Sequence, residues 1–235
     1  MNGADALDLA AYRRSVAESY AAARRAGQGP DGHRTWMRDR DTLFRDHPQS
    51  ALAADERVSF GGLDYWPYDL EYRVTAGIAE TPPLTIDVPH SGEGTTRFTR
   101  IGRLEFTVAG AEHGLDLFWL DAYGGGLFLP FRDATNGTAT YGGGRYLLDT
   151  GKGADLGIDD GHLVLDFYYA YHPSCAGRNA AATTQTMASP AAMVSERKVD
   201  DEVIIRAGTD LPHRDSGICR TSDSHATVAI AEPLL

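Results

Sequence analysis

The sequence GRLEFTVAGAEHGLDLFWLDAYGGGLFLPF, residues 102–131, decides the fold. Apolar residues alternate with polar ones from Leu104 to Val108, and a similar alternation returns in residues 115–119 and 127–131. This period of two is typical of strands that bury one face, and a His-Gly pair and a triple glycine separate the three runs. Because no helical pattern lies between them, we expect adjacent antiparallel strands in a β-sandwich or barrel-like core.

Further elements are expected towards the C-terminus. Residues 163–171, LVLDFYYAY, form an almost continuous apolar and aromatic run that predicts a strand, and residues 203–206 predict another. Residues 176–195 are rich in Ala, Thr and Ser and follow neither period, which predicts a mobile loop or flap. Residues 209–235 form a polar tail rich in turn-forming residues.

The N-terminal part follows a helical period. Apolar side chains recur every three or four positions in residues 5–26, and residues 33–46 repeat the pattern before a His-Pro pair ends it. We therefore expect a mainly β protein, α+β overall. Its N-terminal helical arm, residues 1–50, would lie outside a β-rich core domain of residues 51–208.

Composition excludes several classes of protein. Of the 235 residues, 42% are hydrophobic and 23% are charged, which is ordinary for a globular protein. No apolar run approaches the ~20 residues of a membrane-spanning helix, so we expect no membrane partner. Twenty-two Lys and Arg stand against 33 Asp and Glu, and the net charge of −11 argues against nucleic acid as a partner.

Cysteine content and the N-terminus bear on the compartment. Two cysteines, Cys175 and Cys219, are too few for a secreted disulfide scaffold. The first residues lack the basic and apolar segments of a secretory signal. We expect a cytoplasmic protein, with a homodimer formed through the N-terminal helices as one arrangement.

The densest cluster of polar and aromatic residues lies in residues 130–150. The Asn-Gly pair at 136–137 is typical of a hairpin turn, which would bring Asp133 close to Tyr141 and Arg145. The glycines before Arg145 permit close approach of a ligand or a strand. This convergence indicates a site, although a bulged hairpin with an internal Asp–Arg pair explains the same residues.

A second cluster follows in residues 166–175. If this segment continues as a strand, Asp166, Tyr168 and His172 share one face. A buried Asp166 needs a partner, because an unpaired carboxylate in a core costs several kcal/mol, and Arg145 is the natural candidate. Asp166 could then act as a base and His172 as an acid, since imidazole titrates near pH 6.5. A plain ion pair and a surface histidine are the alternatives.

No metal or cofactor is expected. His172 and Cys175 have the spacing of two metal ligands, but no second pair follows at ligand spacing. Cys175 could be a nucleophile paired with His172, although a free cysteine is more often simply buried. Glycines 142–144 lack the spacing of a dinucleotide-binding motif and precede no helix.

Seven short motifs occur in order along the chain: WMRDR at 36–40, HPQS at 47–50, GLDYWPY at 62–68, PFRD at 130–133, TYGGGRY at 140–146, DFYYAY at 166–171 and IRAG at 205–208. In these motifs the sequence resembles a family of uncharacterised prokaryotic proteins, domain-of-unknown-function family 1684. The resemblance covers roughly residues 30–208 and implies no particular reaction.

The chain departs from the pattern of that family in two places. It has Tyr168 and His172 where members usually have Asn, and segment 176–195 replaces a second cysteine and a Pro-rich turn. The resemblance thus implies a common scaffold that is refitted for a different small molecule. The residues that are kept are Asp133, Tyr141, Arg145, Asp166 and Cys175.

Three classes of function follow. The first is an enzyme of bacterial specialised metabolism, a cyclase, lyase or hydrolase that uses acid–base chemistry in a β-rich pocket. The second is a non-catalytic module for a small molecule or carbohydrate, and the third is an interaction protein that uses its N-terminal helices. The catalytic candidates are Asp133, Tyr141, Arg145, Asp166 and His172, and the substrate-binding candidates are Trp66, Trp119, Tyr146, Tyr168, Tyr171 and Cys175.

Overall fold

The computed structural model of the protein describes residues 2–89, 95–137 and 140–172. Its helices are α1 (Gly3–Ala26), α2 (Pro30–Asp46) and α3 (Ala54–Val58), with short 3-10 helices at Leu70–Tyr72, Thr150–Lys152 and Phe167–Tyr169. Its strands are β1 (Arg73–Ala76), β2 (Ile78–Ala79), β3 (Leu84–Pro89), β4 (Thr95–Val108), β5 (Ala111–Leu120), β6 (Leu127–Phe131), β7 (Arg145–Asp149), β8 (Ile158–Asp159) and β9 (His162–Asp166). The expected strand at 203–206, the loop at 176–195 and the tail from 209 lie outside the described residues.

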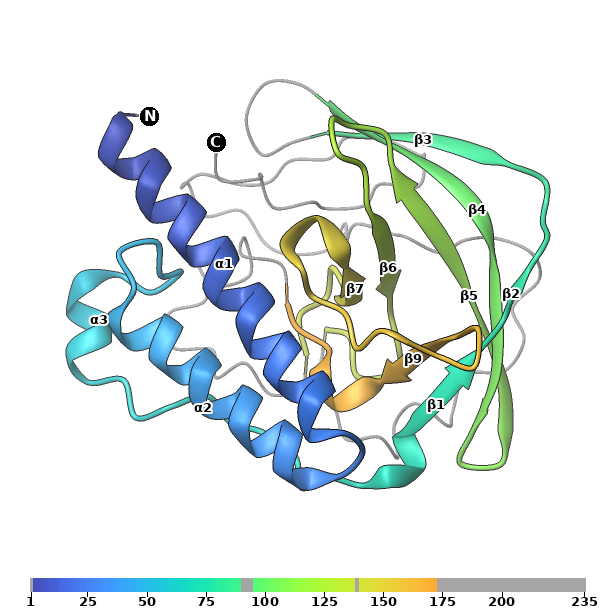
Figure 1. The fold of residues 1–235 in the computed structure, drawn as a ribbon, viewed down its shortest axis with the longest axis horizontal. Coiled ribbons are helices and arrows are strands. Elements are labelled where there is room, and N and C mark those ends of the chain that lie inside the picture. The colour runs from blue at the N-terminus through green and yellow to red at the C-terminus, as the bar shows by residue number, and fades with distance from the viewer. Residues whose placement is uncertain (1, 90–94, 138–139, 173–235) are drawn as a thin grey trace.

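The two long helices form a hairpin on one side of the sheets (Figure 1). A capping box starts α1, because the side chain of Asn2 accepts the N–H of Asp5 at 2.9 Å and Asp5 accepts the N–H of Asn2 at 3.0 Å. Pro30 starts α2, where its missing N–H costs nothing. Both predicted helices are confirmed, and each begins slightly earlier than expected.

The strands form two antiparallel sheets. One has the order β1-β9-β8, and the other has the order β2-β4-β5-β6-β7 with β3 also paired to β4. A tight turn at Ala109 and Gly110, both with positive φ, joins β4 to β5. The expectation of a turn at His113 and Gly114 was wrong, because both residues belong to β5 and are paired with β4. Gly114 leaves room for Arg103, whose Nε would lie 2.6 Å from a Cβ at that position.

The main hydrophobic core fills the space between the two sheets and the helical hairpin. It includes Leu104 of β4 and Leu129 of β6 from the larger sheet, and Leu165 of β9 from the smaller one. A second cluster of buried residues, which includes Phe118 and Phe128, lies on the larger sheet. The predicted α+β fold, with antiparallel sandwich-like sheets and an N-terminal helical region, is confirmed.

The helices belong to this core. Tyr20 of α1 and Trp36 of α2 are each only 2% exposed, and both pack in the main cluster. The hydroxyl of Tyr20 also donates to the carbonyl of Tyr169 at 3.1 Å. The helical arm therefore packs directly on the β-rich part of the protein, because its apolar stripe carries aromatic rings long enough to reach the sheets. The domain boundary at residue 50 stays a prediction, and the one at 208 lies outside the described residues.

The predicted strand at 163–171 is only half right. β9 ends at Asp166, where the side chain accepts the N–H of Tyr168 at 3.1 Å and so starts a 3-10 helix. After this turn the chain rejoins the larger sheet, where the backbones of Tyr146 and Tyr171 exchange two hydrogen bonds of 2.9 and 3.1 Å. This return places the next residue, His172, beside β7.

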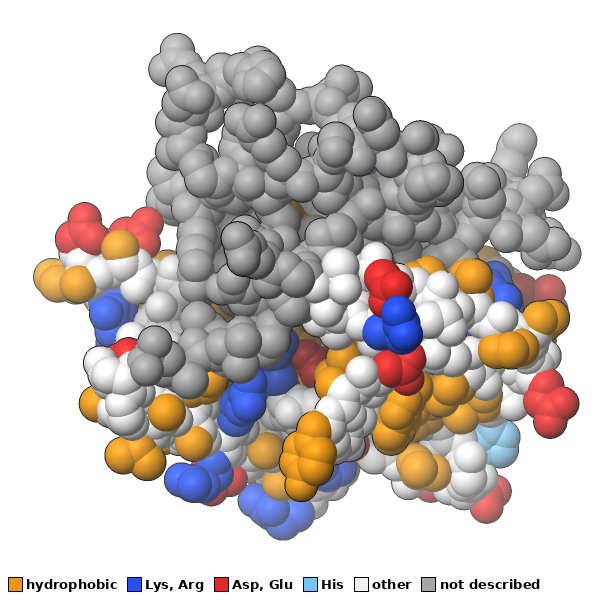
Figure 2. All heavy atoms as spheres, turned by 90° about the horizontal axis from the view of Figure 1, so that it is seen from above, with side chains coloured by type: hydrophobic (Ala, Val, Ile, Leu, Met, Phe, Trp, Pro, Cys, Tyr) orange, Lys and Arg blue, Asp and Glu red, His pale blue; other side chains and the backbone are white. Residues whose placement is uncertain are grey.

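Large hydrophobic side chains on the described surface are scattered. On the face seen in Figure 2, hydrophobic side chains alternate with acidic and basic ones. Single exposed apolar residues of this kind are ordinary for a folded protein. The exposed side chains include Leu7 on α1, Val58 on α3, Ile78 on β2 and Ile158 on β8.

Among the described helices, none combines the length and the apolar character needed to traverse a lipid bilayer.

Replacing Tyr20 by Ala tests the contribution of α1 to the core. We expect the free energy of unfolding to fall by about 3–5 kcal/mol, as for other buried aromatic side chains, because the ring and its hydrogen bond to Tyr169 are lost. Equilibrium unfolding in urea measures this change. The control is Tyr123→Ala, since Tyr123 is fully exposed in a turn and its loss should change stability by about 0.5 kcal/mol or less. Equal stability of the two variants would show that α1 lies outside the core.

Candidate functional site

A buried ion pair forms the centre of the candidate site. Arg145, the first residue of β7, is 2% exposed, and its Nη2 donates to Oδ2 of Asp133. The predicted burial and pairing of Arg145 with one of two acids is confirmed, with Asp133 as the partner. The guanidinium also lies 4.7 Å from the ring centroid of Phe131. Burial lowers the pKa of Arg145, and the carboxylate of Asp133 opposes this shift.

The loop between β6 and β7 is fixed around Asp133. Oδ1 of Asp133 accepts both the N–H of Thr135, at 2.9 Å, and its hydroxyl. The side chain of Asn136 accepts the N–H of Asp133 and donates to the carbonyl of Tyr141 at 2.6 Å. The hydroxyls of Thr135 and Thr140 are 2.9 Å apart. These bonds confirm that the turn brings Tyr141 back towards Asp133.

His172 adjoins this loop and is buried. Its ring centroid is 6.2 Å from that of Tyr141, which is partly buried. Burial, followed by the positive charges of Arg145 and Arg40, lowers the pKa of His172 from 6.5 to about 3. The expectation that His172 titrates near neutral pH was therefore wrong, since the imidazole is neutral there.

Arg40 of α2 reaches the same region. Its guanidinium lies 5.2 Å from the ring centroid of Trp36, 5.5 Å from that of Phe44 and 5.6 Å from that of Tyr171. The hydroxyl of Tyr171 donates to Oδ2 of Asp149 at 3.3 Å. Helix α2, strand β7 and the segment after the last 3-10 helix therefore meet around Tyr171 and His172.

Sequence reasoning missed three charged residues in this region. Arg40 stands one turn after Trp36 in the motif WMRDR, so the motif itself was the available signal. Asp149 and Lys152 form an ion pair of 2.8 Å, and Lys152 lies 6.0 Å from the ring centroid of Tyr146. Nothing in their local sequence distinguishes this pair from an ordinary i,i+3 pair.

Asp166 belongs to a different cluster. It has no exposed surface, and its Oδ2 accepts the hydroxyl of Tyr68 at 2.8 Å and Nη1 of Arg73 at 3.4 Å. The expected partner, Arg145, was wrong, because Arg73 is paired with Asp166 across β1 and β9. Burial raises the pKa of Asp166, and the hydroxyl of Tyr68 is the main opposing influence.

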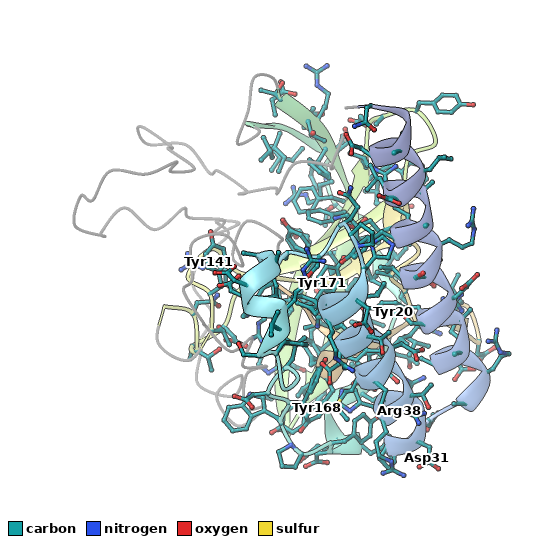
Figure 3. The ribbon with its side chains drawn as sticks, turned by 90° about the vertical axis from the view of Figure 1, so that its left-hand side faces the viewer. Tyr20, Asp31, Arg38, Tyr141, Tyr168 and Tyr171 are labelled. Carbon is teal, nitrogen blue, oxygen red and sulfur yellow. The ribbon has the colours of Figure 1, made fainter. Side chains whose placement is uncertain are left out.

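The expected common face of Asp166, Tyr168 and His172 was also wrong. The alternation of a strand stops at Asp166, and the 3-10 helix that follows turns the later side chains elsewhere. Figure 3 shows Tyr168 well away from Tyr141 and Tyr171. Asp166 and Tyr168 therefore do not line the site around Arg145.

Tyr168 instead joins an aromatic cluster around His33 of α2, which the sequence analysis did not single out. His33 is 1% exposed, and its Nε2 lies 3.2 Å from the carbonyl oxygen of Tyr168. Burial lowers the pKa of His33 to about 4. Five aromatic side chains surround His33, with ring centroids 5.2–6.2 Å from its own: Trp36, Tyr65, Tyr68, Tyr168 and Tyr169.

The remaining substrate-binding candidates are dispersed. Tyr146 is buried beside the site, with its ring centroid 5.8 Å from that of Tyr171. Trp66 packs against the main core, and Trp119 is 41% exposed on β5. No described ring contact joins either tryptophan to Tyr141 or His172, and Cys175 lies outside the described residues. Within residues 2–89, 95–137 and 140–172, no group of three or more His, Cys, Asp or Glu could hold a metal ion.

A family model described as "Protein of unknown function (DUF1684)" matches residues 58–184, more than half of the chain. The chain belongs to the DUF1684 family. A similar solved structure is the solution NMR structure of the uncharacterized protein from gene locus rrnAC0354 of Haloarcula marismortui. It is 29% identical, with a TM-score of 0.42, and the match covers 64% of this chain and 84% of that one. No curated protein matches the sequence.

The DUF1684 match includes the buried pair and the residues beside it. Asp133, Tyr141, Arg145 and His172 all lie within residues 58–184, whereas Arg40 precedes them. The site of this DUF1684 protein therefore combines residues inside the matched region with a cation supplied by α2.

Replacing Arg145 by Met tests the buried pair. We expect the free energy of unfolding to fall by about 3–5 kcal/mol, because Asp133 would keep a buried charge without its partner. The control is Arg97→Met, which breaks an exposed pair with Asp87 and should change stability little. Adding Asp133→Asn to Arg145→Met should recover part of the loss in a double-mutant cycle measured in urea. A fully stable Arg145→Met variant contradicts the burial of this charge.

The buried state of His172 predicts a pH dependence of stability. Between about pH 6.5 and the folded pKa of about 3, the unfolded chain binds a proton at His172 that the folded chain does not. The contribution of His172 to the free energy of unfolding is therefore complete above about pH 6.5. It decreases as the pH falls, by up to about 1.4 kcal/mol per pH unit.

The variant His172→Asn should lack this part of the pH dependence. Urea unfolding of the wild type and the variant at several pH values between about 4 and 7 gives the difference between their slopes. His162→Asn is the matched control, because His162 is exposed, and it should keep the wild-type slope. Identical slopes for wild type and His172→Asn would mean that His172 is not buried as a neutral group.

Proposed function

We propose that this protein is an enzyme that binds a small organic molecule beside Arg145, His172 and Tyr141 and transfers a proton to or from it. One observation carries the proposal: two buried nitrogens, Nε of Arg145 and Nε2 of His172, have no hydrogen-bond partner among the described residues. Buried polar groups are nearly always paired, and each unmade bond costs about 1–3 kcal/mol. A bound molecule that pairs with these nitrogens would remove that cost.

His172 is the group of this site that we propose to accept the proton. Because the imidazole is neutral at physiological pH, one ring nitrogen has a lone pair free for a proton. The nearby charges of Arg145 and Arg40 destabilise the resulting imidazolium, so the proton passes readily to a leaving group or product. Such transfers are common to the cyclase, lyase and hydrolase classes. The proposal places this activity in the cytoplasm and in bacterial specialised metabolism.

The other groups of the site would hold Arg145 and the bound molecule in position and would not exchange protons with it. Asp133 holds the guanidinium of Arg145 and is itself held by Thr135 and Asn136. The ring of Tyr141 lies against His172, where it can line the bound molecule. In this proposal Asp166 maintains the fold through Arg73 and takes no part in the reaction.

A second candidate function is a non-catalytic module that binds a small molecule or carbohydrate. The same low pKa of His172 favours it, since a nitrogen with a pKa of about 3 is a weak base and is well suited to a plain hydrogen bond. The two functions differ in whether the bound molecule is converted.

Incubation of the purified protein with a bacterial metabolite extract tests the proposal. We expect one component to decrease and a product to appear with time in liquid chromatography and mass spectrometry. His172→Asn should reduce this rate by about 10²–10⁴-fold, as loss of a general base does, and His162→Asn should leave it unchanged. A component retained in native mass spectrometry but never converted would support the binding module. Equal conversion by wild type and His172→Asn would remove His172 from the reaction.

A further inference from the structure

We infer that the molecule bound at this site carries an oxyanion, a carboxylate or a phosphate group, that accepts a hydrogen bond from Nε of Arg145. The inference rests on the proposed function and names its substrate class. Three features of the described residues support it. One buried donor of Arg145 has no acceptor, both carboxylate oxygens of Asp133 already accept hydrogen bonds, and the charges that act on His172 are positive.

Arg145 has a charged donor without an acceptor. Its Nη2 is used by Asp133, but Nε is buried and has no partner among the described residues. The side chain is 2% exposed, so bulk water does not hydrate this N–H. A guanidinium presents Nε and Nη2 as a fork, and its strongest acceptors are carboxylate and phosphate oxygens. A ligand oxyanion fits the unused part of the fork.

Asp133 cannot supply the missing bond. Its Oδ2 accepts Arg145, and its Oδ1 accepts the N–H and the hydroxyl of Thr135. Asn136 fixes its backbone by accepting the N–H of Asp133 and donating to Tyr141. A carboxylate held by this many bonds has no freedom to move to Nε, so the acceptor comes from outside the loop.

The charges that act on His172 have a positive sign. Arg145 approaches from β7 and Arg40 from α2, and both disfavour a charged imidazole. Tyr141 of the loop is the ring neighbour of His172. The described acids of this region are already paired, Asp133 with Arg145 and Asp149 with Lys152. A ligand cation would be repelled here, whereas an oxyanion would be attracted by both guanidinium groups.

Binding of an oxyanion would also change His172. A negative charge beside the imidazole offsets Arg145 and Arg40, so the pKa of His172 rises on binding. The imidazole would then become a better base only when the correct ligand is present. This coupling gives the site a way to select an acid over its neutral analogue.

Matched acids and amides test the inference. The probes are sodium benzoate, sodium succinate and inorganic phosphate, with benzamide and succinamide as neutral counterparts at constant ionic strength. We expect an acid or phosphate to shift the NMR signals of the His172 imidazole nitrogens and to bind at least about tenfold tighter than its amide in calorimetry. A response to benzoate or succinate assigns a carboxylate, and a response to phosphate alone assigns a phosphate.

Variants of Arg145 and Arg40 localise the effect. Arg145→Lys keeps the charge opposite Asp133 but removes Nε, and it should weaken binding of the responding anion at least about tenfold. Arg97→Lys is the matched control on the surface and should bind as the wild type does. If Arg145→Lys does not fold, Arg40→Gln provides the test, because it should weaken binding of the acid but not of the amide.

The outcomes separate this inference from the proposed function. Amides that bind as tightly as acids, or an Arg145→Lys variant that binds the anion like the wild type, would overturn the oxyanion while the small-molecule site stands. Failure of every probe to shift His172 also overturns the oxyanion. Conversion of a component in the metabolite extract is measured without these probes, so it decides the proposed function independently.

Discussion

The buried ion pair between Asp133 and Arg145 is the interaction on which the site depends. Two charges with almost no exposure to water are tolerated only when each has its partner and additional hydrogen bonds. Thr135 and Asn136 supply those bonds on the side of Asp133, and they also fix the loop that carries Tyr141. The charge of Arg145 in turn helps to keep His172 neutral. One pair thus sets the shape of the loop and the protonation of its neighbour.

The sequence was sufficient for those parts of the fold that depend on local pattern. Alternation within residues 102–131 predicts β4, β5 and β6, because the period of two directly reflects which face is buried. The position of the helices depends on contacts with distant segments, such as the bond from Tyr20 to Tyr169, and these leave no local signal. The early end of β9 depends on one side chain, that of Asp166, which starts a turn instead of pointing into a sheet.

The difference between local pattern and distant contacts also explains which parts of the site could be predicted. Asp133 and Arg145 are 12 residues apart and joined by a turn, so their pairing could be predicted. Asp166 and Arg73 are 93 residues apart, and the register of β1 against β9 brings them together. His172 was assigned the wrong protonation state because it is buried, and because the positive charges of Arg145 and Arg40 also lower its pKa. Burial and charges contributed by distant elements are set by the whole fold, and alternation along one strand cannot reveal them.

The 3-10 helix after β9 has a consequence for how this scaffold can change. Asp166 is anchored in the smaller sheet and Tyr171 in the larger one, so the residues between them form a spacer of fixed length. Adding or removing one residue would disrupt the 3-10 helix or displace Tyr171 from its backbone pairing with Tyr146. Substitution at positions such as 168 or 172 leaves that length intact. The scaffold can therefore acquire new chemistry at the end of the spacer by exchanging side chains, but not by insertion or deletion within it.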